Sequence, residues 1–492
     1  MSGATGSILS NFGALQALNG IAAAQSANNT YETQLSTGLS INSPADNPAG
    51  FIEAQGFTSQ VNGVTQASSN ANEGISLLQT AQGAVQQQLD VAQKLNSMAV
   101  QAANGTQTPQ EAQSLQSVVS QLTSQITTIA QQTQFNNINL LDGTFSGVQF
   151  QIGANEGQTL SLSIGSTQAN SIGMNTLSAS ATLYGGSAAV TKTGAAFTAG
   201  SLAINGSNGT AKVAVTASES ASSIAAGVNA LTNQTNVSAQ ATTQLALTVK
   251  GGSGSAFNFT LGNGTSASPT NTVTISATGV SGLVNAINAD TAKTGITAVQ
   301  QGSANSKSIV LTQSQGQNIS MTGVANGSFT VGSGKGAGTY GGTTTAGTFT
   351  AATTGATLVA QGQVSFQSDQ SFSVGNAGNI GLKSQSNLLS LSSINVSTTA
   401  GANSAINVIK YAIEGLNNLG GQLGASQQRL TATLNNLTTT NANLQNGLAT
   451  VQDANIPAVS QQLTQSQIQA QAGVAALKSS TTLQQAFLSL LP

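Results

Sequence analysis

The two ends of this 492-residue chain carry the same apolar ladder, and the long middle carries none. Counted in steps of three and four residues, nine of twelve positions in residues 61–99 are apolar. The same count through residues 406–451 visits fourteen positions, and all but Gly420, Gln427 and Asn441 are aliphatic. A 3.5-residue period held over about five heptads predicts long helices that wind on partner helices. The two ends must therefore pack on each other, on copies of themselves, or on both.

The composition excludes most enzyme chemistry. The chain has no histidine, cysteine or tryptophan, so imidazole and thiolate catalysis, thiolate zinc sites and histidine-ligated haem are excluded. Its thirteen acids and eleven bases are scattered, and neither a cofactor nor a metal is expected. Only 5% of the residues are charged, which gives a surface that hydrates without repelling its own copies. This composition favours self-association.

Charge and hydropathy also bear on partners and location. No segment is basic enough to predict nucleic-acid binding, and no run of eighteen apolar residues predicts a membrane span. The first ten residues have neither a cationic start nor a continuous apolar core, so no cleavable signal peptide is expected. A cytoplasmic protein would fit these features. Export of an unfolded, cysteine-free chain by a machine that recognises an uncleaved end would fit them equally.

Helix signals and stop signals organise the first part of the chain. Residues 5–35 predict a helix whose weak ladder would be marginal in isolation. The glycines and prolines of residues 36–57 predict a loop, and the ladder helix that starts at Val61 should stop near Asn104-Gly105. Residues 108–111, Thr-Pro-Gln-Glu, form a capping-box pattern with proline at the first helical position. A second, antiparallel helix is therefore expected after a short turn.

The middle of the chain has the two-residue period of β-strands. A hairpin is expected over residues 148–164, and all-β structure from about 170 to 390, with disorder as the alternative. The apolar and Asn positions of residues 224–239 recur at residues 283–298 with a constant shift of 59. Two related modules side by side, at about 212–262 and 272–323, are predicted, with chance similarity as the alternative.

Several stretches are similar to the bacterial flagellins. The matching residues lie within about 1–165 and 390–492 and occur in the family's order. They are LSTGLSINSPADNPAG (35–50), AVQAANGT (99–106), QTQFNNINLLDG (132–143), QIGANEG (151–157), LGASQQRL (423–430), VQDANIP (451–457) and the final Leu490-Leu491.

This resemblance implies an α+β fold, in which long N- and C-terminal helices form a coiled-coil rod and a β-rich outer region lies between them. It implies inner-tube helices at 1–40 and 453–492, core segments at 41–165 and 391–452, and a variable outer region at 166–390. It further implies a non-enzymatic subunit of the extracellular filament used for swimming, exported unfolded through the flagellar type III apparatus and added at the distal end. The implied partners are other copies of the chain, a cap protein, hook-associated junction proteins and an export chaperone.

Two other functions stay open at this point. A hook–filament junction protein would share the terminal helices but make a single ring, and the matches at 35–43 and 423–430 favour flagellin over it. A secreted β-rich adhesin would need a signal peptide or a translocator. Polymerisation of the purified protein into long filaments would separate these possibilities.

The ladder positions and the apolar residues of the end helices are the candidate subunit-packing residues, since a buried aliphatic side chain contributes about 1.5–3 kcal/mol. Arg429, the only arginine of the chain, is expected to pair with a carboxylate on a facing helix or to be solvated. The candidates are Ile8, Phe12, Leu15, Val61, Val64, Ile75, Leu78, Val85, Leu89, Ile406, Ile409, Ile413, Leu416, Leu423, Arg429, Leu430, Leu434, Leu437, Leu444, Leu448, Val451, Leu477, Leu490 and Leu491.

The chain also departs from the family pattern. Ser40 stands where flagellins usually carry an arginine, so the filament contacts of this loop should differ. Asn96 and Ser97 stand where many flagellins carry the arginine and glutamate that the vertebrate innate receptor recognises. Weak recognition by that receptor is therefore expected.

Overall fold

The computed structural model describes residues 12–178, 184–185, 197–216, 219–249, 256–264, 269–301, 308–323, 329–332, 357–380 and 382–488. The chain divides into two compact units, which are described separately below. The first comprises residues 1–78, 147–162 and 425–492, and the second comprises residues 79–146 and 163–424. Among the described residues, no helix combines the length and the apolar character needed to span a membrane.

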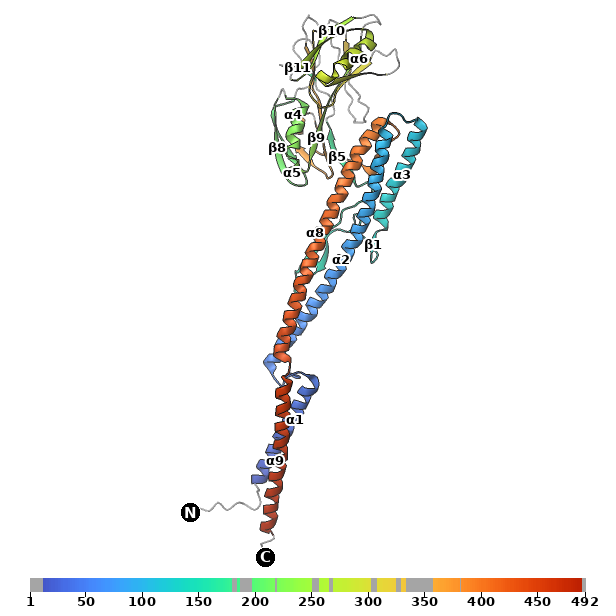
Figure 1. The fold of residues 1–492 in the computed structure, drawn as a ribbon. Helices are drawn as coiled ribbons and strands as arrows, with labels where there is room; N and C mark the ends of the chain where they lie inside the picture. The colour runs from blue at the N-terminus through green and yellow to red at the C-terminus, as the bar shows by residue number, and fades with distance from the viewer. Residues whose placement is uncertain are drawn as a thin grey trace. The chain divides into compact units, whose positions relative to one another are not determined.

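Long helices form both ends of the described chain, and short ones lie within the central region (Figure 1). The long helices are α1 (Phe12–Thr37), α2 (Pro48–Ala103), α3 (Pro109–Gln132), α8 (Thr399–Gln452) and α9 (Ile456–Leu488). The short ones are α4 (Ala221–Asn229), α5 (Thr232–Thr235), α6 (Gly279–Ala289), α7 (Thr291–Thr294) and the 3₁₀ turns η1 (Ala377–Ile380) and η2 (Leu391–Ser393).

Helix α2 begins earlier than the sequence predicted. The loop was expected to continue to residue 57, but the helix starts at Pro48. Proline is tolerated in the first helical turn, where its missing N–H costs no hydrogen bond. The Asn47 side-chain Oδ1 caps this end by accepting a hydrogen bond from the Gly50 N–H at 3.1 Å. This proline therefore starts the helix instead of extending the loop.

Helix α3 begins with the predicted capping box, which the structure confirms. The Thr108 hydroxyl accepts a hydrogen bond from the Glu111 N–H at 3.4 Å, and the Glu111 carboxylate accepts one from the Thr108 N–H at 2.8 Å. The Glu111 carboxylate also accepts a hydrogen bond from the Thr108 hydroxyl at 2.9 Å. The two hydrogen bonds to the carboxylate, first the one from the Thr108 backbone and then the one from its hydroxyl, lower the pKa of Glu111 below its usual value.

In the first unit, the ladders of α2 and α8 meet. Val64 and Ala67 of α2 form a buried cluster with Leu437 of α8. Gly74 allows a second close approach, because a Cβ atom there would lie 3.0 Å from Leu430 and 3.5 Å from Phe150. Phe150 belongs to the antiparallel hairpin of β3 (Val148–Gln151) and β4 (Thr159–Leu162), which confirms the hairpin predicted for this segment.

The central region within the second unit is mostly antiparallel β-structure. One seven-stranded sheet has the order β12-β13-β9-β17-β5-β19, with β15 also on β9. A five-stranded sheet has the order β11-β10-β14-β16-β6, and a three-stranded sheet the order β18-β7-β8. The strands are β1 (Gln134–Phe135), β2 (Ile138–Asn139), β5 (Gly173–Ser178), β6 (Tyr184–Gly185), β7 (Gly200–Asn205), β8 (Thr210–Val215), β9 (Ser238–Val249), β10 (Ala256–Gly264), β11 (Pro269–Thr278), β12 (Ile296–Gln301), β13 (Ser308–Gln313), β14 (Ile319–Thr322), β15 (Phe329–Gly332), β16 (Thr357–Ala360), β17 (Gln363–Ser368), β18 (Ser373–Gly375) and β19 (Asn387–Ser390).

The internal repeat makes the same contacts in both copies. The Asn229 side chain at the end of α4 donates to the Ala239 carbonyl at 3.0 Å and accepts from the Ala239 N–H at 2.7 Å. Fifty-nine residues later, Asn288 at the end of α6 does the same with Ala298, at 2.9 and 2.7 Å. Each asparagine ties its helix to the strand that follows. A hairpin precedes the helix in both copies, whereas the predicted boundaries at 212 and 272 fall within the second strand of each hairpin, so each copy begins one strand earlier than predicted.

The second copy is inserted into the first. In the chain, β10 to β14 lie between β9 and β17, yet β17 and β18 return to pair with β9 and β7 of the first copy. Strands β13 and β14 pair with β12 and β10 in the corresponding registers. In the first copy Ala239 pairs with Phe366, and in the second copy Ala298 pairs with Leu311 at the equivalent position. Likewise, Ile204 pairs with Val374 in the first copy, and Asn263 pairs with Ile319 in the second. The two copies are thus nested and share one sheet, in which β13 pairs with β9.

Candidate subunit-packing surfaces

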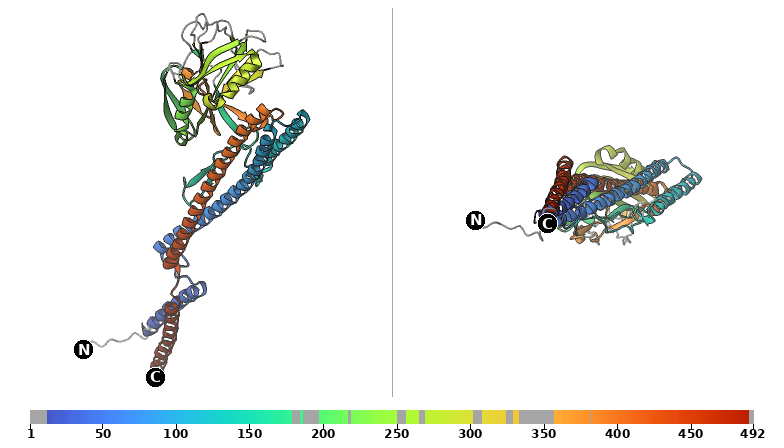
Figure 2. Two further views of the ribbon diagram at one scale, coloured as in Figure 1. Left: turned by 45° about the horizontal axis from the view of Figure 1, so that its top comes forward. Right: turned by 90° about the horizontal axis from the view of Figure 1, so that it is seen from below.

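Helices α1 and α9 lie side by side in both views of Figure 2. The Asn28 and Ser466 side chains hydrogen-bond across it. Gly473 brings α9 close to α1, since a Cβ atom there would lie 2.8 Å from the Ile21 side chain. Ala24 is the only buried residue within Phe12–Thr37. The pair therefore buries little of its own apolar surface.

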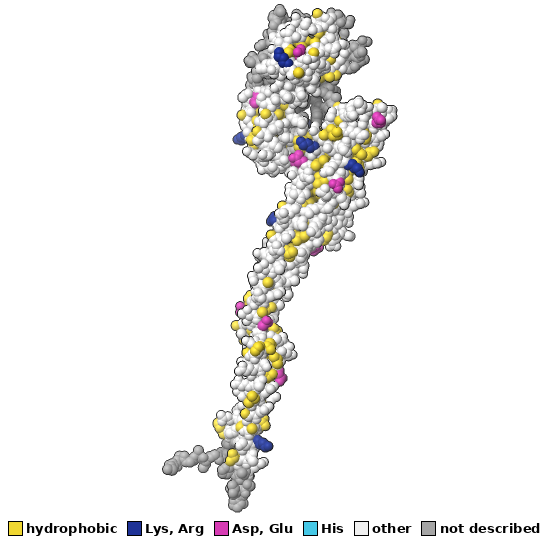
Figure 3. All heavy atoms as spheres, in the orientation of Figure 1, with side chains coloured by type: hydrophobic (Ala, Val, Ile, Leu, Met, Phe, Trp, Pro, Cys, Tyr) yellow, Lys and Arg dark blue, Asp and Glu magenta, His cyan; other side chains and the backbone are white. Residues whose placement is uncertain are grey.

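Large apolar side chains of both end helices stay exposed. On α1, Phe12 is 78% exposed and Leu15 is 60% exposed, and on α9 Ile468 is 60% exposed. Figure 3 shows hydrophobic side chains on the drawn face of these helices, with few charged groups among them. Leu18, Val474 and Leu483 are exposed as well. The candidate set included none of these three and did not include Ile468. An exposed apolar set of this size on two neighbouring helices is typical of an interface.

The loop before α2 docks on the link between α8 and α9. The Ser40 N–H and hydroxyl both donate to the Gln452 carbonyl, at 2.6 and 3.1 Å, and the Ala454 N–H donates to the Gly38 carbonyl at 2.9 Å. In this loop the Asp46 carboxylate accepts hydrogen bonds from the backbone N–H groups of Ser43 and Asn42. Both bonds lower the pKa of Asp46, and the bond from Ser43 has the larger effect. Ser40 thus makes short, neutral contacts within its own chain.

Nine of the candidate ladder residues are buried by the chain itself, so they stabilise the subunit rather than lie on its surface. They are Val64, Leu78, Val85, Leu89, Ile409, Leu416, Leu423, Leu430 and Leu437. Nine more are half-buried and border the exposed faces: Val61, Ile75, Ile406, Ile413, Leu434, Leu444, Leu448, Val451 and Leu477. Phe12, Leu15 and Arg429 are exposed, and Ile8, Leu490 and Leu491 lie outside the described residues.

Polar ladder positions make specific contacts between α2 and α8. Asn441 donates to the Thr65 hydroxyl at 2.9 Å, and Gln82 lies 3.9 Å from where a Cβ of Gly424 would be. Such contacts fix the register of paired helices. Arg429 makes no ion pair with any residue that the structure describes, so in the single chain it is a surface arginine.

Sequence reasoning missed Gln88, a fully buried residue of α2. Its Nε2 donates to the carbonyl oxygens of Ile126 in α3 at 3.0 Å and of Thr167 at 3.4 Å. Its Oε1 has no hydrogen-bond partner among the residues that the structure describes. Gln88 lies off the ladder count within a run of three glutamines. The signal that could have found it is helical spacing, because it lies three residues after Val85 and four before Ala92, both of which are buried.

A second group that the sequence did not reveal joins α8 to the central β-structure. The Asp369 carboxylate accepts from Asn236 and from Asn418 of α8, both at 2.7 Å. About two turns away on α8, the Tyr411 hydroxyl lies 2.5 Å from the Ser238 hydroxyl of β9. Burial, and then the nearby Asp369, raise the pKa of Glu414, which lies between Tyr411 and Asn418 in α8.

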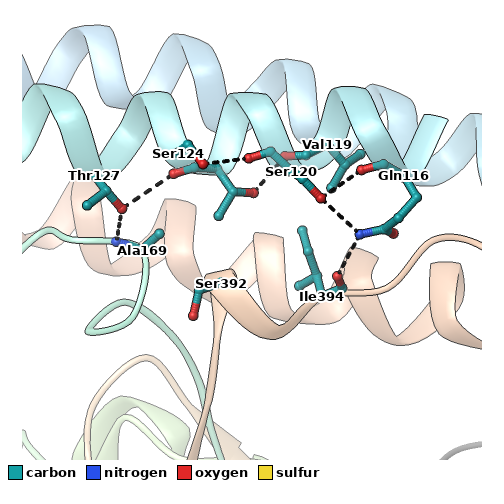
Figure 4. A pocket seen from close by; sticks show the side chains of 9 residues that line it. Gln116, Val119, Ser120, Ser124, Thr127, Ala169, Ser392 and Ile394 are labelled. Atoms are coloured by element: carbon teal, nitrogen blue, oxygen red, sulfur yellow. Dashed lines mark hydrogen bonds between the residues drawn. The ribbon is translucent and has the colours of Figure 1, made fainter. Parts of the chain in front are cut away.

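A polar cavity of about 210 Å³ lies beside α3 (Figure 4). Hydroxyl groups of Ser120, Thr123 and Ser124 line one wall, and no acidic or basic side chain lines it. Gln116 closes one end: its Nε2 donates to the Ile394 carbonyl at 3.3 Å, and its Oε1 accepts from the Val396 N–H at 2.6 Å. These neutral groups supply hydrogen bonds but no acid or base for catalysis.

Comparison with known proteins agrees with this geometry. A family model described as the bacterial flagellin N-terminal helical region matches residues 8–146, and the corresponding C-terminal helical region matches residues 406–491. The B-type flagellin of Pseudomonas aeruginosa is 31% identical over 491 residues, which cover 98% of each chain. A flagellin of Serratia marcescens is 38% identical over 162 residues, 33% of this chain and 46% of that one.

Two solved structures are also similar. FliC from Burkholderia pseudomallei is 21% identical, and the match covers 72% of this chain and 99% of that one with a TM-score of 0.30. The flagellar hook-associated protein-3 from Legionella pneumophila is 13% identical, covers 81% and 96%, and has a TM-score of 0.31. The full-length sequence match and the two family models decide the assignment: this chain belongs to the bacterial flagellin family, whose members are structural subunits of the flagellar filament.

Proposed function

We propose that this chain polymerises with copies of itself through the exposed faces of α1 and α9, and that the half-buried residues of α2 and α8 add contacts between neighbouring copies. The observation that carries the proposal is the pairing of two end helices that leave Phe12, Leu15 and Ile468 at least 60% exposed. Water is an unfavourable environment for these side chains, and another copy of the same surface would cover them.

The low charge of the chain supports a homopolymer. Its formal net charge is −2 over 492 residues, so copies packed closely in a filament repel each other weakly. The absence of histidine and cysteine, together with the structural role of the family, supports a subunit without catalytic activity.

Folding of the end helices would accompany assembly. Because α1 buries only Ala24 within the single chain, tertiary packing contributes little to its stability, and an isolated helix of this kind is marginal. Ordering it costs free energy that contacts with other copies would offset. Export of the unfolded chain through the flagellar type III apparatus, with an export chaperone, and addition at the distal end beneath a cap protein complete the proposal. Hook-associated junction proteins would be further partners.

Seeded polymerisation tests the proposal. Purified full-length protein is mixed with sheared filament fragments and imaged by negative-stain electron microscopy. Long filaments are expected, whereas rings or short stacks that stop growing would favour a hook–filament junction protein. Protein that stays monomeric at every concentration, with seeds and precipitating salt, would overturn self-assembly. Hydrogen exchange adds a second readout: amides of α1 and α9 should exchange fast in the monomer and slowly in the polymer.

A further inference from the structure

The sequence contains eight Asn-Gly pairs, a dipeptide in which the backbone can attack its own side chain. The glycine nitrogen is unhindered because no Cβ lies next to it. Attack requires this nitrogen to be free of hydrogen bonds and the asparagine side chain to be free to rotate. The fold meets these conditions at some pairs and denies them at others, so it determines which pairs can react.

Two pairs have both groups free. Asn104-Gly105 lies in the turn after α2, where both residues are exposed, and a Cβ atom at Gly105 would meet nothing within 4 Å. Asn208-Gly209 lies in the turn between β7 and β8, where Asn208 is exposed. Gly209, with a φ of +150°, is half-buried, and a Cβ atom there would lie 3.2 Å from the Gln234 carbonyl oxygen. The N–H groups of Gly105 and Gly209 donate to no backbone acceptor among the described residues.

In the remaining described pairs, hydrogen bonds hold the glycine nitrogen or the asparagine side chain, and these are called held pairs below. Asn19-Gly20, Asn62-Gly63 and Asn446-Gly447 lie within α1, α2 and α8, where helical hydrogen bonds hold the glycine nitrogens and helical ψ angles direct them away from the preceding side chain. The pair at 326–327 lies outside the described residues.

Two held pairs are close matches to the reactive ones. In the same β7–β8 turn as Asn208, the Gly206 N–H that follows Asn205 donates to the Gly209 carbonyl at 2.9 Å. Asn263, which like Asn208 is followed by Gly-Thr, is 4% exposed. Its Nδ2 donates to the Thr294 carbonyl at 2.9 Å, and its Oδ1 accepts from the Thr270 hydroxyl and the Asn271 amide, both at 3.1 Å. These two asparagines share the dipeptide but not the freedom to react.

We propose that Asn104 and Asn208 are sites of spontaneous deamidation in the folded protein. The glycine nitrogen loses its proton to solvent base and forms a bond to the asparagine Cγ. The Cγ–Nδ2 bond breaks, and the side-chain nitrogen leaves as ammonia after protonation by solvent. Water then opens the cyclic imide at either carbonyl, which gives aspartate or isoaspartate. The net reaction consumes one water and releases one ammonia, and no enzyme or oxidant is needed.

Conversion changes the electrostatics of this chain substantially, because it carries so little charge. Two conversions add two carboxylates and take the formal net charge from −2 to −4. At the β7–β8 turn the new carboxylate follows Ser207, whose hydroxyl accepts from Asn236 at 2.9 Å, and Asn236 also donates to Asp369 at 2.7 Å. A negative charge is therefore added next to a residue that Asn236 links to the Asp369 carboxylate.

Peptide mapping of aged protein tests the proposal. Full-length folded protein is incubated at mildly alkaline pH, and each Asn-Gly peptide is followed by mass spectrometry with enzymatic isoaspartate labelling. Asn104 and Asn208 should convert at least about tenfold faster than Asn62, Asn446 and Asn263, since exposing a held pair requires local unfolding of about 1.4 kcal/mol or more.

Two controls make the result decisive. In concentrated urea the rates at all these pairs should become similar, because the dipeptide is the same and the fold no longer protects it. In folded protein, Asn208→Gln should abolish conversion at the β7–β8 turn, whereas Asn205→Gln should leave it unchanged. Equal rates at exposed and helical pairs in folded protein, or no conversion at Asn104 and Asn208, would overturn the proposal.

Discussion

Replacing Phe12 and Leu15 together by serine should weaken assembly without unfolding the subunit. Full burial of such a side chain contributes about 1.5–3 kcal/mol. Scaled by the exposed fractions of 78% and 60%, which another copy could still cover, the two side chains together could contribute about 2–4 kcal/mol to the interface. The critical concentration for polymerisation should therefore rise about 30-fold to about 1,000-fold.

The assay is sedimentation of the polymer from seeded solutions across a concentration series. Val299→Ser is the matched control, because Val299 is 62% exposed but lies on β12, far along the chain from the end helices. This variant should polymerise at the wild-type concentration. Far-ultraviolet circular dichroism should show that neither variant loses the α2–α8 helices. The reasoning fails if the double variant raises the critical concentration less than about threefold, or if Val299→Ser raises it as much.

Three further changes test contacts inside the subunit. Asp369→Ala removes the acceptor shared by Asn236 and Asn418 and should lower the free energy of unfolding in urea by about 2–4 kcal/mol, while Asp369→Asn should recover part of the loss. Gln88→Ala should cost about 2–4 kcal/mol, because it leaves a cavity and removes the Nε2 hydrogen bonds to the Ile126 and Thr167 carbonyls, whereas Gln88→Met should cost less than about 1.5 kcal/mol. Partial burial and then the nearby Asp369 raise the pKa of Glu414 in the folded state above the usual glutamate value of 4.5, but the residue is largely exposed, so solvent screening keeps the effect on stability small. The folded protein binds this proton more tightly, so the small stability contribution is present below pH 4.5 and is lost as pH rises through the folded pKa. Glu414→Gln should remove that pH dependence. If the urea midpoints of the variant and the wild type change with pH in the same way between pH 4 and pH 7, the assignment is wrong.

The local signals in the sequence predicted structure well where one short pattern was sufficient. The capping box at Thr108 and the hairpin at 148–164 both appear as expected, because each depends on contacts between residues close in sequence. The start of α2 was wrong, because Pro48 was interpreted as a loop residue although it is also favoured in a first helical turn.

The nested arrangement of the outer modules could not be predicted in the same way. The helix and asparagine positions repeat with one shift, but the strands that complete the first copy, β17 and β18, come after the whole second copy. Strands β17 and β18 correspond to β13 and β14 in how they pair, not in which residues they contain. For example, Phe366 and Leu311 differ in type but occupy equivalent positions in the two copies. Gln88 and Asp369 were missed for a related reason, since their partners are distant in sequence and hydrogen bonds through a side-chain amide or carboxylate leave no periodic pattern.

Burial divides the apolar residues of the helical ends into two sets with different consequences. The ladder residues such as Leu78 and Leu430 are buried within one chain, so truncating them should first lower subunit stability and should affect assembly only through that loss. The end-helix residues are exposed, and α1 has one buried residue in 26, so truncating them should leave the subunit intact and act on assembly directly. A 3.5-residue ladder alone cannot make this distinction, because α2 and α8 satisfy each other's stripes while α1 and α9 together do not. The incompletely covered pair is therefore the part of the chain where another copy has the most apolar surface to bury.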